Sequence, residues 1–565
     1  MCRLHFLFVF FVTLAIQLSD RVWAVEVWTP WEASLTSTRS YANPYANVTV
    51  SVAYTAPNGT RTTGNAFWDG GSTFRVRFMF PESGIWSWRT ASSDTYNKGL
   101  HNRTGTVTVT PYTGANTLYS RGYPKVSGNA RYLTYGNGVP FLWLGDTAWA
   151  APIAATQAEW EAYINQRRDQ KFNVIQVHTG RGWLSRTKDR SGNAPFLGSG
   201  SSLRWNPAYW QGVDQKVRYA NSQGLFVFFT AISTPGSGFP TTNTTEVRRF
   251  ARNFAARMNG YFVVYSPVAD GFPTSPADAC GNELAARAPR HLVTAHPRFE
   301  LSPAQTFHDR SYTDFAGLQS GNGWPEPFSA LAASQNAIDW TLALYEQMPL
   351  KPVINMEVVY DSMRLQSGDT VRYLQPYPTR MPRSAAYLAI LSGSQGVTYG
   401  AGGVWNWGNP VGNASAGWSL ETALNQPSAT QMQYAFDLFS GLEWWSLVPS
   451  HQYIQDQSAD PLRRMVFARS ADGRLGVAYL PDNGQITLDM TAFAGLVIAR
   501  WFNPVTNLWD EPPAEPEPVA NNGTYTFLKP TEWADAVLVL TVPEGVSGAE
   551  IRCGSLGISA SRNGR

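Results

Sequence analysis

The stretches 261–270, YFVVYSPVAD, and 352–357, PVINME, decide the fold. Each is a short apolar run of the kind found in buried strands, and each ends in a carboxylate, Asp270 or Glu357. The C-terminal strand ends of a (β/α)8 barrel converge on one face, where groups far apart in the sequence can flank one bond. The two stretches therefore predict parallel strands that bring two carboxylates together.

Strand-like and helix-like patterns alternate through the middle of the chain. Apolar runs separated by amphipathic stretches, among them 158–170, 246–259 and 337–348, argue for a parallel sheet covered on its outer side. The candidate strands are FLWLGD (141–146), FNVIQVHT (172–179), GLFVFFTA (224–231), YFVVYSPVAD (261–270), HLVTAHP (291–297), SYTDFAGLQS (311–320), PVINMEVVY (352–360) and GVTYGAGGVW (396–405). These units predict an α/β fold, a (β/α)8 TIM barrel over 114–449 that the helix-like stretch 428–445 closes. A doubly wound open sheet is the competing topology.

All-β patterns flank this barrel on both sides. Residues 25–113 show alternating strand patterns and closely spaced turn signals, which predict an N-terminal β-sandwich of the immunoglobulin-like sort. Residues 450–543 carry another series of apolar runs with turns at 482–484 and 522–523, and predict a second all-β domain. Residues 544–565 have the composition of a loose polar tail.

The N-terminus has the features of a secretion signal. Arg3 precedes an apolar run over 6–18, and the small residue Ala24 ends a site suited to signal peptidase, so residues 1–24 are predicted to be removed. A membrane anchor is the alternative, but the run is shorter than the roughly 20 residues that span a bilayer. We expect a secreted protein without stable membrane insertion. It would be a glycoprotein in a eukaryotic host, since Asn-x-Ser/Thr acceptors occur at Asn47, Asn58, Asn102, Asn243, Asn413 and Asn522.

Composition excludes several classes of function. Hydrophobic residues make up 43% and charged residues 15%, with a net charge of +3, which gives a globular chain without the basic face that nucleic acid requires. Aromatic residues reach 13%, and flat rings cover the apolar faces of sugars, although most such rings fill cores. The sequence leaves the oligomeric state open.

Cysteine and histidine are scarce. Removal of the signal leaves Cys280 and Cys553, which excludes a disulfide framework and a multi-cysteine metal site, and we expect no disulfide between them. The seven histidines include no His-Glu-x-x-His and show no convincing metal spacing with carboxylates. No metal and no cofactor are predicted.

Asp270 and Glu357 are the candidate catalytic pair. Glycoside hydrolysis requires one protonated carboxyl that donates to the leaving oxygen and one ionised carboxylate that attacks or activates water. An acidic group at the end of an apolar strand is otherwise costly unless it is paired. The structural alternatives are that Glu357 pairs with Arg364 or Arg383, and that Asp270 forms a loop turn before Gly271.

Five blocks of sequence carry a family resemblance. They are PFLWLGDTAW, HLVTAHP, DFAGLQSGNG, KPVINMEVVY and AYLAILSGSQGVTYGAGGVWNW, in this order across the predicted barrel. Through them the chain resembles the apiosidase-like family of secreted glycoside hydrolases, whose barrel includes glycoside hydrolase family 140. The flanks fit as well: DGGSTFRVRFMFPESGIWSWRT resembles the β-sandwich that often precedes such barrels. VAYLPDNGQITLDMTAFAGLVIARWFNPVTNLW resembles the C-terminal domain described as "putative collagen-binding".

The resemblance implies roles for the two carboxylates. Glu357 falls on the seventh strand, where similar retaining barrels keep their nucleophile, and Asp270 would be the acid/base. The fourth strand departs from the family, because 267–270 reads PVAD where the pattern ends Gly-Gly-Asp. The implied reaction is retaining cleavage of O-glycosidic bonds in plant or microbial polysaccharide side chains, with a furanosyl or otherwise branched residue as the expected sugar.

Further polar and aromatic residues stand at predicted strand ends, and their shared face favours substrate-binding roles. For Asp146, binding a sugar hydroxyl and capping the next helix are equal alternatives. Glu283, in a helix-like segment, is expected at the surface. The predicted substrate-binding residues are Asp146, His178, Arg181, His296, Gln319 and Trp405.

A non-catalytic binding protein is the alternative to an enzyme. A barrel could keep its fold and lose its chemistry while its β domains hold glycan or collagen, and the altered approach to Asp270 is the main support for this alternative. Turnover of glycosides by the wild type, lost in Glu357→Gln, separates the two.

Overall fold

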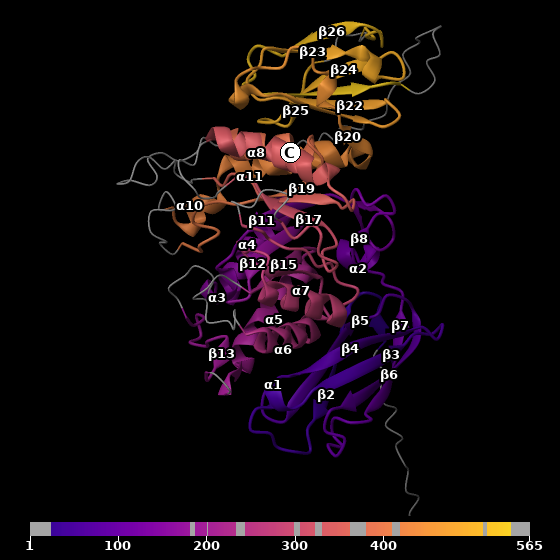
Figure 1. The fold of residues 1–565 in the computed structure, drawn as a ribbon, viewed down its shortest axis with the longest axis vertical. Coiled ribbons are helices and arrows are strands. Elements are labelled where there is room, and N and C mark those ends of the chain that lie inside the picture. The colour runs from indigo at the N-terminus through magenta and orange to yellow at the C-terminus, as the bar shows by residue number, and fades with distance from the viewer. Residues whose placement is uncertain are drawn as a thin grey trace, which may run out of the picture.

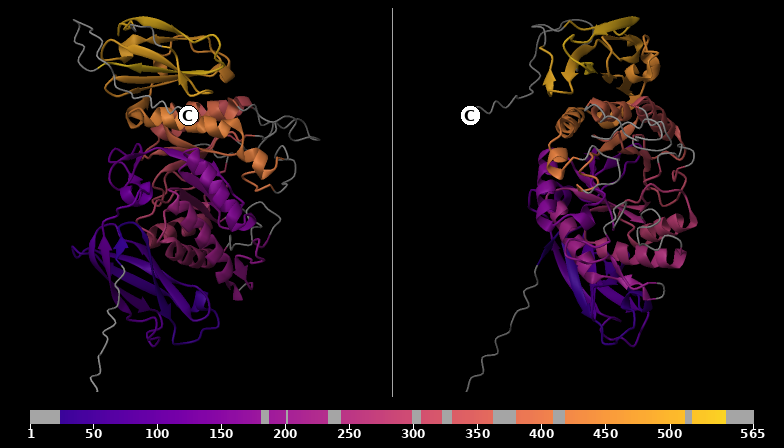
Figure 2. Two further views of the ribbon diagram at one scale, coloured as in Figure 1. Left: turned by 180° about the vertical axis from the view of Figure 1, so that it is seen from behind. Right: turned by 90° about the vertical axis from the view of Figure 1, so that its left-hand side faces the viewer.

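The computed structural model describes residues 24–180, 187–199, 202–232, 243–298, 306–321, 330–361, 380–408, 418–511 and 517–543. Three parts follow one another along the long axis of the molecule (Figures 1 and 2). Strands of the N-terminal part lie at one end, an α/β part fills the middle, and strands of the C-terminal part lie at the other end.

The N-terminal part is rich in strands. The strands are β1 (Val25–Glu26), β2 (Pro30–Thr36), β3 (Val50–Thr55), β4 (Arg61–Trp68), β5 (Thr73–Met79), β6 (Gly84–Ser92) and β7 (Thr104–Thr110), joined in the order β1-β7-β6-β3-β4-β5-β2, with α1 (Pro44–Asn47) beside them. On β5 the apolar side chains Phe74, Val76 and Phe78 are buried in the core of this part. The alternate residues Arg75 and Arg77 point to the opposite face, as the period of a strand requires.

The middle part contains a parallel sheet. Its strands are β11 (Trp143–Thr147), β12 (Val174–His178), β15 (Phe226–Ile232), β16 (Val263–Val268), β17 (Ala316–Gln319), β18 (Val353–Glu357) and β19 (Ser394–Tyr399). The order is β16-β15-β12-β11-β19-β18-β17, and every neighbouring pair is parallel. Seven of the predicted strands are thereby confirmed, and the first and last of them lie side by side.

The predicted strand 291–297 joins this sheet only through isolated bridges. Tyr265 on β16 forms a parallel bridge with Val293, and Gly271 forms one with Pro297. On the other side, the carbonyl of Val293 accepts from the amide of Asp314, which precedes β17. The segment therefore lies between β16 and β17, where a fifth strand would stand, without forming a strand of its own.

Helices cover the sheet. They are α2 (Thr117–Arg121), α3 (Ala151–Ala154), α4 (Gln157–Asp169), α5 (Pro207–Ser222), α6 (Thr244–Met258), α7 (Ser275–Arg287), α8 (Ala330–Glu346), α9 (Arg380–Ile390), α10 (Leu420–Leu424) and α11 (Pro427–Ser440). Four of them confirm the predicted helices. α4 begins with a full capping box between Thr156 and Glu159, which satisfies amide groups that the first turn leaves open. Short strands complete this part: β8 (Lys125–Val126), β9 (Leu133–Thr134), β10 (Pro140–Phe141), β13 (Phe196–Leu197) and β14 (Arg204–Trp205).

The C-terminal part is all-β, as predicted. One antiparallel sheet has the order β20-β21-β22-β27-β24-β25, and β23 pairs with β26. The strands are β20 (Leu447–Pro449), β21 (Val466–Ser470), β22 (Leu475–Leu480), β23 (Gln485–Asp489), β24 (Ile498–Asn503), β25 (Leu508–Trp509), β26 (Thr524–Leu528) and β27 (Ala536–Thr541). The 3-10 helices are η3 (Trp444–Ser446), η4 (His451–Tyr453), η5 (Pro461–Arg463) and η6 (Met490–Ala492).

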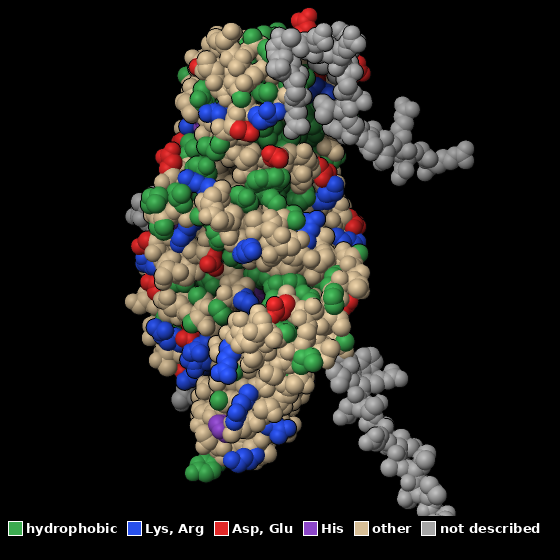
Figure 3. All heavy atoms as spheres, turned by 90° about the vertical axis from the view of Figure 1, so that its right-hand side faces the viewer, with side chains coloured by type: hydrophobic (Ala, Val, Ile, Leu, Met, Phe, Trp, Pro, Cys, Tyr) green, Lys and Arg blue, Asp and Glu red, His purple; other side chains and the backbone are tan. Residues whose placement is uncertain are grey.

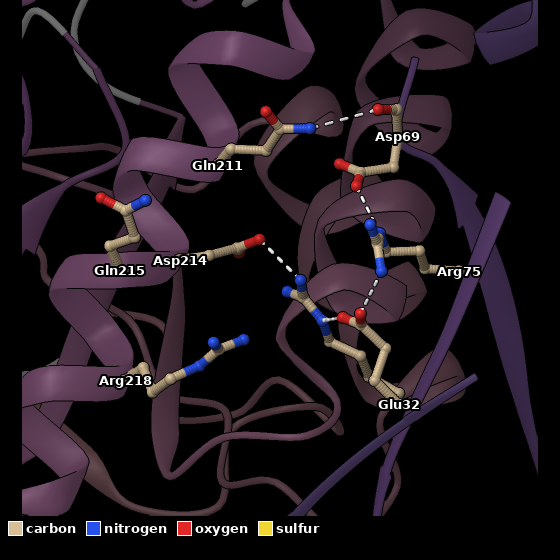
Figure 4. Close-up of a pocket in the computed structure, with 8 residues that line it drawn as sticks. Glu32, Asp69, Arg75, Gln211, Asp214, Gln215 and Arg218 are labelled. Atoms are coloured by element: carbon tan, nitrogen blue, oxygen red, sulfur yellow. Dashed lines mark hydrogen bonds and ion pairs between the residues drawn. The ribbon is translucent and has the colours of Figure 1, made fainter. Parts of the chain in front are cut away.

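Buried ion pairs hold the N-terminal part against the middle part. Arg77 on β5 donates to Asp214 on α5 at 2.7 Å, and Arg257 on α6 reaches both Asp214 (2.7 Å) and Asp69 (3.0 Å). A pocket of about 350 Å³ opens beside these residues, and Figure 4 shows side chains from the strands and from α5 facing each other across it. Because these charges are buried and paired across the junction, they constrain how the two parts pack.

Figure 3 shows basic and acidic side chains interspersed over one face, with basic ones more frequent toward the N-terminal part. Among the described residues, none of the helices is both long and apolar enough to span a bilayer.

Cys280 is free and buried on α7. Three predicted features lie outside the described residues: Cys553, the signal with Arg3 and its apolar run, and the tail 544–565.

Candidate functional site

Glu357 ends β18, after the buried residues 353–356, apolar except for Asn355, have carried that strand through the core. The register between β17 and β18 shifts at this point, so that Gln319 lies opposite Glu357. The carbonyl of Glu357 accepts from the amide groups of Ser320 and Gly321. A Cβ at Gly321 would lie 2.1 Å from the Val359 nitrogen, so this close approach requires glycine. Irregular pairing of this kind re-aims side chains at active sites.

Asp270 lies in the loop after β16. Its φ is +45°, a left-handed conformation that aspartate tolerates better than most residues do. The next residue is glycine, and a Cβ there would come within 2.5 Å of the Val268 side chain. The altered approach 267–270 therefore still delivers a carboxylate to the strand end, with a side chain that is 23% exposed.

His296 stands between the two carboxylates. Its Nε2 lies 3.4 Å from Glu357 Oε2, and its Nδ1 lies 3.6 Å from Asp270 Oδ1. One oxygen or nitrogen atom from each of Asp270, His296 and Glu357 lies within 4.8 Å of the others. Gln319 joins the group, because its Nε2 donates to Asp270 Oδ1 and approaches His296 Nδ1 at 3.0 Å. The structure thus brings four of the predicted site residues together.

Burial dominates the electrostatics of Glu357. The pKa of its carboxyl is raised above the ordinary value, first by burial and further by the charge of Asp270. Hydrogen bonds from His296 and Tyr360 act in the opposite direction. Burial beside Glu357 also raises the pKa of the Tyr360 hydroxyl well above its usual range, so Tyr360 remains a neutral donor. Sequence reasoning did not single out Tyr360, although it follows Glu357 by three residues.

Trp149 packs against two histidines of the site. Its ring stacks on that of His178, with centroids 4.6 Å apart, and meets the ring of His296 edge-on at 5.0 Å. His178 is buried, its Nδ1 lies 2.6 Å from Thr230 Oγ1, and burial lowers its pKa to about 3. His178 is therefore a neutral side chain. Trp149 was missed as a site residue, although the motif LGDTAW that contains it was recognised.

His178 and Trp405 each bury a nitrogen that has no partner in the described parts of the chain. These nitrogens are His178 Nε2 and Trp405 Nε1. The carbonyl of Trp405 accepts from the amide of Ala150, next to Trp149. Buried polar atoms are normally satisfied, so a bound hydroxyl-bearing ligand would complete both.

Asp146 does not have the environment predicted for it. It is fully buried, and Arg167 on α4 donates to it at 2.6 Å and the Tyr163 hydroxyl at 2.7 Å. The neighbouring Thr147, whose side chain interacts with Tyr360, points to the opposite face of β11. Asp146 therefore ties the sheet to α4 rather than contacting a sugar. It caps neither following helix, since α3 and α4 begin after Ala150 and Thr156.

Four further residues named in the sequence analysis are Arg181, Arg364, Arg383 and Glu283. Arg181 and Arg364 lie outside the described residues. Arg383 pairs with Asp535 of the C-terminal part at 2.8 Å, and so does not pair with Glu357 as the structural alternative required. Glu283 lies on α7 as expected, but it is buried against Arg252 and Arg287 rather than at the surface.

The cluster also has the composition of a metal site. Asp270, His296 and Glu357 each offer one ligand atom, and they form the sole such group found in the described ranges. The amide nitrogen of Gln319, however, donates to Asp270 Oδ1 and lies 3.0 Å from His296 Nδ1, so it occupies lone pairs of two of these residues. Lone pairs that accept hydrogen bonds are not free for a cation, so this donor set suits proton transfer better than metal binding.

Solved structures share this fold. A protein described as "Glycoside hydrolase" matches with a TM-score of 0.65 and 22% identity over 76% of this chain and 98% of its own. A glycoside hydrolase family 5 protein from Bacteroides vulgatus has the same score and identity over 76% of this chain and 95% of its own. A "putative glycoside hydrolase" from the same species has a TM-score of 0.66 and 17% identity, over 92% and 99%. The comparison with curated proteins gives no match.

Three sequence families match successive parts of the chain. Residues 24–93 match a domain of unknown function, DUF5060, and residues 448–541 match the "Putative collagen-binding domain of a collagenase". Residues 127–446, which carry Asp270, His296, Gln319 and Glu357, match the family described as "Apiosidase-like, catalytic domain". Because that match covers more than half of the sequence, the chain belongs to the apiosidase-like family of glycoside hydrolases.

Proposed function

We propose that the protein hydrolyses glycosides with retention, by double displacement at Asp270 and Glu357. The observation that carries the proposal is the approach of the two carboxylates to within 4.8 Å. Retaining enzymes hold their carboxyl groups about 5–5.5 Å apart, whereas inverting enzymes need about 6.5–9.5 Å to admit a water molecule.

In the proposed reaction, Glu357 attacks the anomeric carbon while Asp270 gives its proton to the leaving oxygen. The glycosidic bond breaks, an alcohol leaves, and an ester joins the sugar to Glu357. Asp270, now ionised, takes a proton from water, whose oxygen attacks the anomeric carbon and releases the carboxylate of Glu357. The places of the two residues support these roles: Asp270 lies in the loop after β16, the fourth strand of the sheet in chain order, and Glu357 ends β18, which is the seventh if the segment 291–297 is counted as the fifth.

A second assignment exchanges the roles. Burial raises the pKa of Glu357, which favours a protonated group and thus an acid, whereas Asp270 is more exposed and accepts from Gln319. Leaving groups decide between the two. Loss of the acid should spare a nitrophenyl glycoside far more than an alkyl glycoside, because nitrophenolate leaves without protonation. The variant that shows this difference, Asp270→Ala or Glu357→Ala, identifies the acid.

Trp149, His178 and Trp405 suit a sugar-binding role beside the carboxylates. An aromatic ring covers the apolar face of a sugar, and the two unpartnered buried nitrogens can bind hydroxyl groups. Gln319 and His296 complete the wall of the site. The family supports carbohydrate as the substrate, and we propose side chains of plant or microbial polysaccharides with a furanosyl or branched residue as the class to test first.

We further propose that the middle part is a complete (β/α)8 barrel. Support comes from the cyclic strand order, in which β11 lies beside β19, and from the segment 291–297 that bridges to β16 and bonds toward β17. Secretion remains a proposal that rests on the signal-like residues 1–24.

Wild-type protein should be incubated with aryl furanosides, aryl pyranosides and plant-wall oligosaccharides, with the anomeric configuration of the product read by NMR. Release of sugar with retained configuration, lost in Glu357→Gln, is the expected result. Inverted product would refute the double displacement. Binding without turnover in every case would favour the non-catalytic glycan-binding alternative.

A further inference from the structure

We propose that Gln319 is a positioning residue that fixes which ring nitrogen of His296 carries the proton and thereby couples Asp270 to Glu357. The proposal rests on the proposed function, because it deepens the roles of the two carboxylates. Gln319 is buried at the end of β17, and its amide nitrogen approaches three groups. They are Asp270 Oδ1, His296 Nδ1 at 3.0 Å and the Pro297 carbonyl at 2.8 Å.

The surroundings determine the orientation of the Gln319 amide. The Pro297 carbonyl offers lone pairs and no hydrogen, and Asp270 presents Oδ1 as an acceptor, which leaves its other oxygen to carry the proton of the proposed acid. An amide oxygen in this place would face two other oxygens, so the NH₂ group must face them.

The tautomer of His296 follows from that orientation. The Gln319 NH₂ group has two hydrogens, which its three neighbours Asp270 Oδ1, Pro297 O and His296 Nδ1 share. Its nitrogen has no lone pair with which to accept, so a proton on Nδ1 would face a group that cannot accept it, and Nδ1 carries no proton in this contact. A neutral imidazole then carries its proton on Nε2, which lies 3.4 Å from Glu357 Oε2. The Trp149 ring packs edge-on against the His296 ring, and the His296 backbone amide donates to Ser266 Oγ at 2.9 Å. These contacts keep the imidazole aimed at Glu357.

One side chain therefore connects both carboxylates. Gln319 donates directly to Asp270, and through His296 it directs a second hydrogen bond at Glu357. The hydrogen bond from His296 favours the ionised form of Glu357. Further titratable groups facing this cluster in the described ranges are His178 on β12, which acts on His296, and Tyr360, which acts on Glu357.

The consequence is a shift in the limb of the pH profile that reports Glu357. Gln319→Met keeps the length and removes the donor, so His296 loses the group that excludes a proton from Nδ1 and the hydrogen bond from its Nε2 to Glu357 weakens. The pKa of Glu357 then rises, because that hydrogen bond lowers it in the wild type. The limb of kcat/KM that reports Glu357, the acidic limb if Glu357 is the nucleophile, should move to higher pH by about one unit.

The direct test is ¹⁵N NMR of histidine-labelled protein, with the His296 signals assigned by their loss in His296→Phe. The wild type should show a bare Nδ1 and a protonated Nε2. Gln319→Glu offers an acceptor in place of the donor and should put a proton on Nδ1. Gln395→Met is the matched control: Gln395 is buried near the opposite end of the sheet, where β19 begins, and its loss should leave the His296 signals unchanged.

The outcomes separate the two proposals. The NMR measurement uses resting protein, so it stands even if no glycoside is cleaved. A protonated Nδ1 in the wild type would overturn the inference, as would a tautomer unchanged in Gln319→Glu. The inference would also fail if wild-type protein cleaves glycosides and Gln319→Met leaves the limb that reports Glu357 in place. Thermal unfolding of each variant confirms that the protein analysed is folded.

Discussion

The pair of Arg383 and Asp535 joins the middle part to the C-terminal part, and breaking it should destabilise that junction strongly. Asp535 is fully buried and accepts from Arg383 Nε (2.9 Å), Arg383 Nη2 (2.8 Å) and the Tyr479 hydroxyl (2.7 Å). Arg383→Met removes two of the three donors and leaves a buried charge with one. Breaking a buried pair on one side costs about 3–5 kcal/mol, most of it from the uncompensated charge.

Hydrogen exchange read by mass spectrometry on peptides from β22 and β27 measures the free energy of local opening next to the pair. Lys171→Met is the matched control, because Lys171 and Asp437 form a pair at 2.5 Å whose lysine side chain is 48% exposed. That pair should contribute at most about 1 kcal/mol. A loss in Arg383→Met no larger than in Lys171→Met would refute the view that burial makes the junction pair strong.

Three further predictions concern the site. Glu357→Gln should raise the free energy of unfolding at neutral pH by about 1.4 kcal/mol for each unit by which burial raises the Glu357 pKa, since the wild type must hold an ionised group there; the melting temperature rises with it. The gain should vanish as the pH falls below about 4, where the wild-type carboxyl is protonated in both states, and a constant difference on scanning calorimetry would contradict it. Glu357→Ala should lose nearly all turnover, and azide should restore part of it, with a glycosyl azide detected by mass spectrometry; no rescue with any aryl glycoside argues against a nucleophilic role. Trp149→Ala should lower kcat/KM by about 5- to 150-fold, because its stacking contact with His178 and its edge contact with His296 amount to about 0.5–1.5 kcal/mol each beyond plain burial; steady-state kinetics check this.

The sequence predicted the strands better than the contacts of their side chains. Apolar runs such as VINM and FVFF place a strand because burial on both faces tolerates few other residues. The same logic located Asp270 and Glu357, since a buried charge at the end of such a run is costly unless it is paired. It did not distinguish the two faces of one strand. Asp146 was expected in the site, yet its side chain turns to α4 and Arg167, whereas its neighbour Thr147 turns toward Tyr360.

The contacts around the two carboxylates could not be predicted from the sequence either. Trp149, His296 and Gln319 come from three separate segments, after β11, in the segment 291–297 and at the end of β17. Only their distances show that Trp149 packs on His296 and that Gln319 contacts both Asp270 and the imidazole. Each residue type is ordinary at such a position, so no single motif reports the arrangement. No sequence pattern predicts the register shift that sets Gln319 opposite Glu357, although this shift decides which side chain faces Glu357. A strand end at which an amide, an imidazole and two carboxylates meet needs every donor matched to an acceptor. At Asp270 this requirement is met by the amide of Gln319, which donates to that carboxylate from a different strand and so helps to hold it in place.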